Sequence, residues 1–143
     1  YIHTSALPII GFSPSDPQWP ERQAERFSLH HRNRGCPVTY HGPDQTIGYP
    51  NLRLRSFCPS PKIYVQKLEE VLIRTLEEWG IIGCRHESLR GVWVNRGEDQ
   101  LEKIASIGIH ISKGITMHGF ALNVNVDLQP FFSSPPAASK AAK

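Results

Sequence analysis

The hydrophobic pattern of this chain changes its period at residue 80, and that change constrains the fold more than any other feature. Before it, apolar residues recur at steps of three and four, as on one face of an amphipathic helix. They are Val65, Leu68, Leu72, Leu76 and Trp79. Ser60 can cap this helix, Pro61 suits its first position, and Gly80 suits the residue just past its end. The charged residues between them are predicted to form a solvated face: Glu69, Glu70, Arg74, Glu77 and Glu78.

After Gly80 the pattern takes the two-residue period of strands. We expect a short strand at Gly91–Val94 and longer ones at Ile104–Ser112 and Phe120–Asp127. In the second, Ile107, Ile109 and Ile111 share one face, and in the third the apolar residues alternate with Ala, Asn and Asp. One helix with several strands predicts an α+β fold.

The segment RGCPVTYHGPDQTIGYP, residues 34–50, concentrates polar groups around a tight turn. It predicts strands at Val38–His41 and Thr46–Tyr49 with Gly42 and Pro43 between them. Binding groups often lie on loops held by a rigid sheet. An ordinary hairpin with a decorated turn explains the same residues, and this segment alone does not decide between the two.

Composition limits the possible functions. The 143 residues are 39% hydrophobic and 20% charged, as in a globular protein, and no apolar run reaches the length of a membrane span. The net charge of +3 is mild and its basic residues are scattered, so we expect no nucleic-acid or membrane partner. Three cysteines without a CxxC spacing favour a reducing compartment over a disulfide framework. The seven histidines show no ligand spacing, so we expect no metal.

The two ends of the chain lack periodicity. Residues 1–29 are proline-rich, and we expect irregular backbone there with a short helix around Glu21–Phe27. Residues 132–143 are rich in Ser, Pro, Ala and Lys, which predicts a disordered tail. The predicted domain is therefore residues 30–131. The start has no basic segment typical of a secretory signal, and it has no initiating Met, which indicates a fragment of a longer product.

Three segments together resemble the octanoyl (lipoyl) transferase family of protein lipoylation. They are RGCPVTYHGPDQTIGYP, GVWVNRGEDQLEKIASIGIHIS and TMHGFALNVNVDLQPF, in the family's order over residues 34–131. The resemblance implies a mixed sheet with helices packed on one side, as in the biotin and lipoate protein ligases. It also implies a bacterial cytoplasmic enzyme, with mitochondrion or plastid as the alternative, and we expect a monomer.

The family's reaction moves an octanoyl group from acyl carrier protein to a lysine of a lipoyl domain, through an acyl-enzyme on a cysteine. The resemblance implies an octanoyl-phosphopantetheine thioester as donor, and no further cofactor. It implies lipoyl domains of 2-oxoacid dehydrogenase E2 subunits and the glycine cleavage H protein as acceptors. A thiolate is the nucleophile in such chemistry, and a nearby ammonium makes it reactive.

The resemblance also assigns the site residues. Lys103 is the ammonium that lowers the pKa of the cysteine, and its place at the start of an apolar strand predicts a poorly solvated side chain. The substrate-binding residues form three walls: Arg34, Gly35, Cys36, Pro37, Val38, Thr39, Tyr40 and His41; Ser106, Ile107 and Gly108; and Gly119, Phe120 and Ala121. Phe120 would offer apolar surface to the acyl chain, and His118 would order the loops.

The sequence departs from the family at the nucleophile. The family's Pro-Cys-Gly motif, expected about a dozen residues after Asp127, does not occur. Cys36 stands at a usual Gly in the substrate loop, whereas Cys58 and Cys84 fit small buried residues. Asp44 and Pro37 also replace usual Gly and Gln.

Three functions remain at this point. The first is the octanoyltransferase, with this chain inactive if it has no replacement for the cysteine. The second is a non-catalytic module that binds acyl chains or carrier proteins. An ATP-using lipoate or biotin ligase is disfavoured because no glycine-rich phosphate loop occurs.

Overall fold

The computed structural model describes residues 2–4, 9–12, 28–31, 38–97 and 100–127, with side chains from residue 41 onward. Contacts divide the chain into two compact units. The first comprises Tyr1–His3 and Thr46–Val124, and the second Thr4–Gln45 and Asn125–Lys143. The predicted helix around Glu21–Phe27 and the predicted tail lie outside the described residues. The division expected from the sequence, into residues 1–29, 30–131 and 132–143, stays a prediction.

The amphipathic helix occurs where its pattern predicts it. Helix α2 spans Pro61–Glu77, and the Ser60 hydroxyl accepts a hydrogen bond from the Ile63 backbone N–H at 3.4 Å. Gly80 follows the helix with φ +73°, and its N–H donates to the Glu77 carbonyl at 2.9 Å. A left-handed residue just past the last turn is a common helix stop, and glycine adopts it without steric cost.

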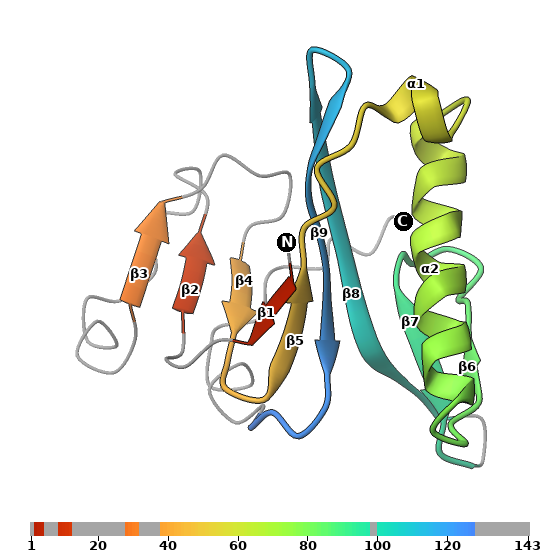
Figure 1. Ribbon diagram of the computed structural model, residues 1–143. Helices are drawn as coiled ribbons and strands as arrows, with labels where there is room; N and C mark the ends of the chain where they lie inside the picture. The colour runs from red at the N-terminus through yellow and green to blue at the C-terminus, as the bar shows by residue number, and fades with distance from the viewer. Residues whose placement is uncertain (1, 5–8, 13–27, 32–37, 98–99, 128–143) are drawn as a thin grey trace, which may run out of the picture. The chain divides into compact units, whose positions relative to one another are not determined.

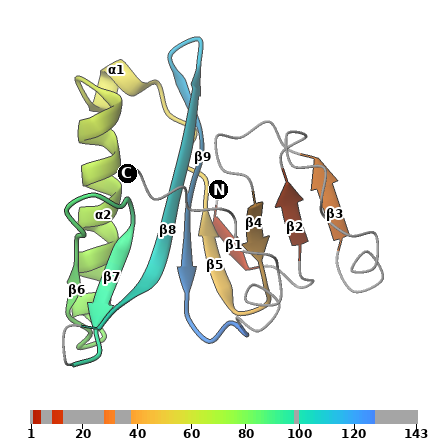
Figure 2. The same cartoon turned by 180° about the vertical axis from the view of Figure 1, so that it is seen from behind.

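A six-stranded sheet lies against α2 in the order β1-β5-β9-β8-β7-β6 (Figures 1 and 2). Its strands are β1 (Ile2–Thr4), β5 (Gln45–Gly48), β6 (Gly83–Cys84), β7 (Val92–Asn95), β8 (Leu101–Ser112) and β9 (Ile115–Asn123). The β6–β7, β7–β8 and β8–β9 pairs are antiparallel. A four-residue helix, α1 (Leu54–Phe57), precedes α2 on the same side of the sheet (Figure 1).

The core forms between α2 and the face of the sheet that carries the apolar alternation. One buried cluster consists of Leu54, Cys58, Tyr64 and Leu68, and a second of Leu72, Leu76, Val92 and Ala105. Ile107, Ile109 and Ile111 pack against the first cluster, as their shared face predicts. Burying these side chains removes apolar surface from water, which is the main stabilising term of the fold. This face is called the helix-side face below.

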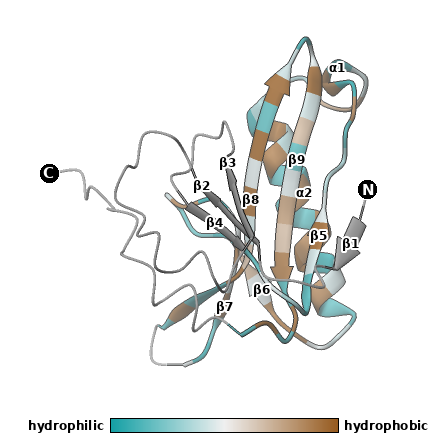
Figure 3. Ribbon diagram, turned by 90° about the vertical axis from the view of Figure 1, so that its left-hand side faces the viewer, coloured by the Kyte–Doolittle hydropathy of each residue, from teal (hydrophilic) through white to brown (hydrophobic). Residues whose placement is uncertain are grey.

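The opposite face of the sheet, called the distal face below, carries smaller and more polar residues. Ser106, Gly108 and His110 are exposed on it, again as the alternation predicts. Figure 3 looks onto the sheet with α2 behind it, and the alternating colours of β8 and β9 reflect this division. No helix within the described residues is long and apolar enough to span a membrane.

The second unit contains a three-stranded sheet in the order β3-β2-β4. Strand β2 (Ile9–Phe12) pairs parallel with β3 (Ser28–His31) and antiparallel with β4 (Val38–His41). The expectation of irregular backbone in residues 1–29 was therefore wrong for these short segments. Pro8 and Pro14 lie on either side of β2, and a short apolar run between prolines gives no clear strand pattern.

The polar turn at residues 41–45 joins strands of two different sheets, β4 and β5, so it does not close a hairpin. Asp44 has φ +60°, the left-handed conformation that favours glycine. The family's usual Gly at this position fits that geometry, and Asp is among the residues that tolerate it. The His41 Nδ1 lies 2.9 Å from the Gln45 Oε1, which ties the two ends of the turn together.

Three sequence expectations in the first unit were wrong. Trp79 is 80% exposed because α2 ends at Glu77, before that position can face the core. Glu69, expected on the solvated face, is only 7% exposed. Strand β9 ends at Asn123, so the predicted continuation to Asp127 is absent and Val124 is 68% exposed.

Candidate active site

Two of the three predicted substrate walls lie opposite each other on neighbouring strands. Strands β8 and β9 pair Ser106 with Ala121, Ile107 with Phe120, and Gly108 with Gly119. Antiparallel partners project to the same face of a sheet. Two of these pairs, Ser106–Ala121 and Gly108–Gly119, therefore belong to the distal face, and Ile107–Phe120 belongs to the helix-side face.

The Ile107–Phe120 pair serves the core. The Phe120 side chain packs against both buried clusters, and its ring lies where a Cβ on Gly48 would have to be. The ring is thus directed away from the distal face, contrary to the expectation that it offers surface to an acyl chain. Any substrate contact at Phe120 on the distal face would fall to its backbone.

Lys103 reaches the distal face because strand β8 contains a bulge. Val92 pairs with Ala105, but the next residue of β7, Trp93, pairs with Lys103, so Ile104 is an extra residue in β8. Val92 and Ala105 are fully buried on the helix-side face, and Trp93 therefore projects to the distal face with its partner Lys103. Strict alternation from Ala105 would have placed Lys103 on the helix-side face. A bulge re-aims a side chain in this way.

The ammonium of Lys103 lies over an aromatic ring. Its Nζ is 4.9 Å from the centroid of Trp93, a distance at which a cation is attracted to the face of an indole. The side chain is exposed, so the expectation of a poorly solvated ammonium was wrong. The bulge accounts for the difference, because it removes Lys103 from the apolar face on which the alternation would place it.

The β9 half of the distal face is covered by the segment that follows β5. A Cβ on Gly119 would clash with the Gly48 carbonyl oxygen and would lie 2.7 Å from the Pro50 Cδ. The preceding residue, His118, pairs with Ile109 of the helix-side face; it has φ +62°, and its ring meets the Tyr49 ring edge-on with centroids 6.0 Å apart. The expectation that His118 orders the loops stays a prediction. By contrast, a Cβ on Gly108 would meet nothing within 4 Å.

The third predicted wall lies largely outside the described residues. Arg34, Gly35, Cys36 and Pro37 belong to the part that is not described, and Val38, Thr39 and Tyr40 are described only as backbone of β4. His41 belongs to the second unit, where it contacts Gln45. The convergence of this wall with the other two stays a prediction.

Neither described cysteine lies where Lys103 could act on it directly. Cys58 is 3% exposed within the first core cluster, on the helix-side face. Cys84 is partly buried and pairs with Trp93 across β6 and β7, so the middle strand separates it from Lys103. Among the described residues, no group of three His, Cys, Asp or Glu side chains is arranged to hold a metal ion.

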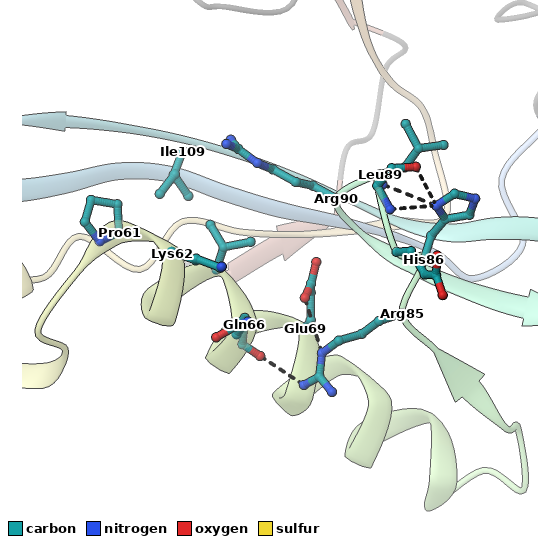
Figure 4. Close-up of a pocket in the computed structure, with 12 residues that line it drawn as sticks. Pro61, Lys62, Gln66, Glu69, Arg85, His86, Leu89, Arg90 and Ile109 are labelled. Atoms are coloured by element: carbon teal, nitrogen blue, oxygen red, sulfur yellow. Dashed lines mark hydrogen bonds and ion pairs between the residues drawn. The ribbon is translucent and has the colours of Figure 1, made fainter.

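A cavity of about 610 Å³ lies on the other side of the sheet, between the first half of α2 and the loop after β6 (Figure 4). It is lined in part by Lys62, Val65, Glu69, Arg85 and Ile109. Arg85 spans its wall: its Nε is 3.3 Å from the Glu69 carboxylate, and its Nη2 is 2.8 Å from that of Glu70. The hydrogen bonds from Arg85 and then Arg74 lower the pKa of Glu70 below its ordinary value.

Sequence reasoning missed two residues beside Lys103. Trp93 was noted only as part of a Gly-Val-Trp-Val strand, and Gly91 only as its first residue. A Cβ on Gly91 would clash with the Ala105 carbonyl oxygen and would lie 3.1 Å from the Lys103 Cε. The available signal was a glycine followed by an aromatic residue on a short strand, but its relation to Lys103 depends on the bulge.

The family is decided by a match along most of the chain. The model of the lipoyl protein ligase A/B catalytic domain matches residues 16–143. This chain belongs to that family. The resemblance drawn from the three segments is thus confirmed.

Relatives and solved structures agree with this family. The chain is 50% identical to an octanoyltransferase of Acidobacterium capsulatum over 111 residues, which are 72% of this chain and 45% of that protein. Other matching curated relatives are also named octanoyltransferase, an acyltransferase, and the chain spans about half the length of those it matches.

The fold has counterparts among lipoate ligases. A solved structure from an archaeal lipoylation system, described as a bi-partite lipoate protein ligase and its E2 lipoyl domain from Thermoplasma acidophilum, is similar with a TM-score of 0.58 at 16% identity. The match covers 90% of this chain and 50% of that one. A lipoate-protein ligase A bound with ATP gives a TM-score of 0.61 at 14% identity, over 90% and 55% of the two chains. At such identities the likeness shows the fold alone, and it confirms the predicted α+β class.

Proposed function

We propose that this chain contributes the acyl-recognition surface of an octanoyltransferase that acts in protein lipoylation. The observation that carries the proposal is the distal face: the bulge places Lys103 on the same face as Ser106 and Gly108, with Ala121 and Gly119 in register beside them. These are the residues to which the family resemblance assigns the reaction. The relatives' name and the family membership support the same activity.

The reaction would proceed in two balanced steps. A cysteine gives up its thiol proton and attacks the thioester carbonyl of an octanoyl group on acyl carrier protein, and the phosphopantetheine sulfur leaves and takes up that proton. The amine of a lipoyl-domain lysine then attacks the acyl-enzyme, an amide forms, and the cysteine is released. The Lys103 ammonium would favour the thiolate by its charge.

Gly108 would leave space for the acyl chain on the distal face. Because no atom of the described residues lies within 4 Å of the position of a Cβ there, an apolar chain could approach the backbone of β8 closely. Backbone N–H groups near a thioester carbonyl could also stabilise the oxyanion that forms on attack. The donor, the acceptor lipoyl domain and a cytoplasmic location belong to this proposal. The description of a similar ligase together with its E2 lipoyl domain supports the acceptor class.

One specific observation favours a second function, a non-catalytic binding module. Neither described cysteine is placed beside Lys103, so a module that binds octanoyl-carrier protein without transferring the acyl group fits the described residues too. The two functions differ in one measurable product, the octanoylated lipoyl domain.

Intact-mass analysis separates them. The chain is incubated with octanoyl-carrier protein and a lipoyl domain, and the masses of all three proteins are followed while binding is measured in parallel. Octanoyl mass on the lipoyl domain supports the transferase. Binding of the octanoyl-carrier protein with no transfer supports the binding module, and neither binding nor transfer contradicts both.

A variant of Gly108 tests the location of the acyl site. Among the described residues no atom lies within 4 Å of a Cβ at position 108, so Gly108→Leu would project into open space on the distal face. We expect acyl-carrier binding to weaken about tenfold or more, as when a pocket is blocked by several methylene groups. Ser112→Leu places the same side chain on the same face of β8 near its end and is the matched control. Equal binding by both variants would place the acyl chain elsewhere.

A further inference from the structure

The exposed lysine of the distal face is held by groups for which the family assignment gives no role. Lys103 is three residues from Ser106 and lies on a bulge, where the ladder of hydrogen bonds is locally interrupted. A flexible side chain in such a place has many rotamers, and its effect on a thiol depends on where its charge is held. Two contacts help to set that position: the Trp93 ring lies under the Nζ, and the Gly91 backbone lies beside the Cε.

Only glycine fits the backbone conformation at position 91. Its φ is +121°, in the region that favours glycine, and a Cβ would clash with the Ala105 carbonyl oxygen. The same Cβ would lie 3.1 Å from the Lys103 Cε and would displace the lysine stem. The absence of a side chain at Gly91 therefore lets the stem of Lys103 lie against the backbone on its way to Trp93.

Glu69 fixes Gly91 from the other side. Its Oε1 accepts a hydrogen bond from the Gly91 N–H at 3.1 Å, and the bond is buried. A carboxylate that is 7% exposed needs compensation, and the Arg85 Nε at 3.3 Å from its Oε2 supplies an opposite charge. This explains why Glu69 is buried although it belongs to the charged side of an amphipathic helix.

The ring of Trp93 is held by a second contact. The His86 ring lies 5.3 Å from it, tilted by 44°. His86 is itself oriented, because its Nδ1 accepts from the Ser88 and Leu89 backbone N–H groups at 3.2 and 3.3 Å. The indole is thus fixed between an oriented imidazole and its lysine partner on β8.

We propose that Glu69, Gly91 and Trp93, called the lysine-supporting cluster, are positioning residues that hold the Lys103 ammonium over the indole ring on the distal face. The inference rests on the proposed function for its purpose, which is to aim the ammonium at the reacting thiol. In this proposal the cluster acts on the reaction through Lys103 and not by binding the substrate. It also links the helix-side cavity wall, through Glu69, to the distal face.

The first test reads the position of Lys103 without any acyl transfer. Protons on the Lys103 Cε that lie over an indole experience its ring current, so their NMR signals should lie upfield of those of Lys113, which is exposed in the β8–β9 turn. The signals are assigned by their loss in Lys103→Arg. Trp93→Leu should abolish the upfield displacement and Trp93→Phe should retain part of it, whereas Trp79→Leu, at an exposed indole, should leave it unchanged.

Two variants test the role of Glu69. Glu69→Gln keeps a side-chain oxygen for the Gly91 N–H and should retain most of the displacement. Glu69→Met removes the acceptor and should reduce it, with Glu77→Met on the exposed side of α2 as control. Unchanged Lys103 signals in both Trp93→Leu and Glu69→Met would overturn the proposal, even if a Gly91→Ala variant fails to fold.

The second test reads the consequence in octanoyl transfer. Trp93→Leu should lower kcat by about fivefold with little change in KM, because the ring acts on the reacting ammonium and not on substrate binding. A lost ring-current displacement with unchanged kcat would show that the cluster holds Lys103 but does not aim it, which overturns the positioning role. A retained displacement in a protein that neither binds nor transfers octanoyl groups would instead reject the proposed function alone.

Discussion

The two faces of the six-stranded sheet follow opposite rules, although they share the same strands. The helix-side face is filled by Ile, Leu, Val and Phe side chains that interdigitate with α2. The distal face has Ser106, Gly108, Ala121 and Gly119, which are small, together with the long side chains of Lys103 and Trp93. The helix-side face requires large apolar side chains that fill the core. The distal face carries mainly small residues that leave its surface open.

This difference shows how one strand can build the core on one side and leave an accessible surface on the other. In β8, Ala105, Ile107 and Ile109 belong to the core side, while Ser106 and Gly108 between them face away from the core. A single extra residue at Ile104 then transfers Lys103 from the first set to the second. The bulge costs part of the ladder between β7 and β8, and it places a cation beside a surface of small residues.

The largest expected effect is the loss of stability when a core residue of the helix-side face is truncated. Leu72 is 2% exposed in the second core cluster, so Leu72→Ala should lower the free energy of unfolding by about 2–5 kcal/mol through lost burial and the cavity left behind. Ser112→Ala, at the exposed end of β8, should change it by less than about 0.5 kcal/mol. Urea unfolding followed by circular dichroism measures both, and similar losses would mean that the two faces are not distinct in energy.

A smaller effect distinguishes the two halves of the distal face. Gly119→Ala would place a Cβ against the Gly48 carbonyl and 2.7 Å from the Pro50 Cδ, and should destabilise by about 1–3 kcal/mol. Gly108→Ala, in register on the neighbouring strand, meets nothing and should be neutral or stabilise by about 0.5 kcal/mol. The same unfolding measurement applies, and a Gly108→Ala loss as large as that of Gly119→Ala would show that β8 is covered as well.

Local patterns in the sequence predicted the elements that depend on local rules. The helix from Pro61 onward, its Ser60 cap and its Gly80 stop follow from capping chemistry and period alone. The core-facing residues of β8 follow from alternation, and so does the membership of Ser106 and Gly108 in the opposite face. The resemblance of three segments predicted the family.

The features that sequence reasoning missed depend on contacts between distant segments. Lys103 changes face because the pairing of β7 with β8 contains a bulge. The extra residue is an Ile in an Ile-rich strand, so the hydrophobic pattern of the sequence does not reveal it. Glu69 is buried because the backbone at Gly91 needs its oxygen, 22 residues away. Phe120 is a core residue because Gly48 on another strand leaves space for its ring. None of these partners can be read from one segment alone.

The smallest expected effect concerns a titrating group within the helix-side core. Burial raises the pKa of Tyr64 above 10.0, opposed in part by its hydrogen bond with Thr116. Its hydroxyl also donates to the Pro50 carbonyl at 3.1 Å. The fold therefore favours the neutral phenol, whose contribution to the free energy of unfolding is complete below pH 10.0 and is lost as the pH rises through the folded-state pKa.

Tyr64→Phe keeps the buried ring and removes the ionisable hydroxyl. At about pH 8 the variant should be less stable than the parent by about 1 kcal/mol, because one hydrogen bond is lost. At about pH 11 the difference should shrink or change sign, since only the parent must then bury a charge or hold a proton that the unfolded chain releases, at a cost of about 1.4 kcal/mol where the two pKa values differ by one. Urea unfolding of both proteins at the two pH values measures this, and a constant difference would mean that water reaches the Tyr64 hydroxyl through the helix-side face. That result would weaken the contrast between the packed core of the helix-side face and the open β8 half of the distal face.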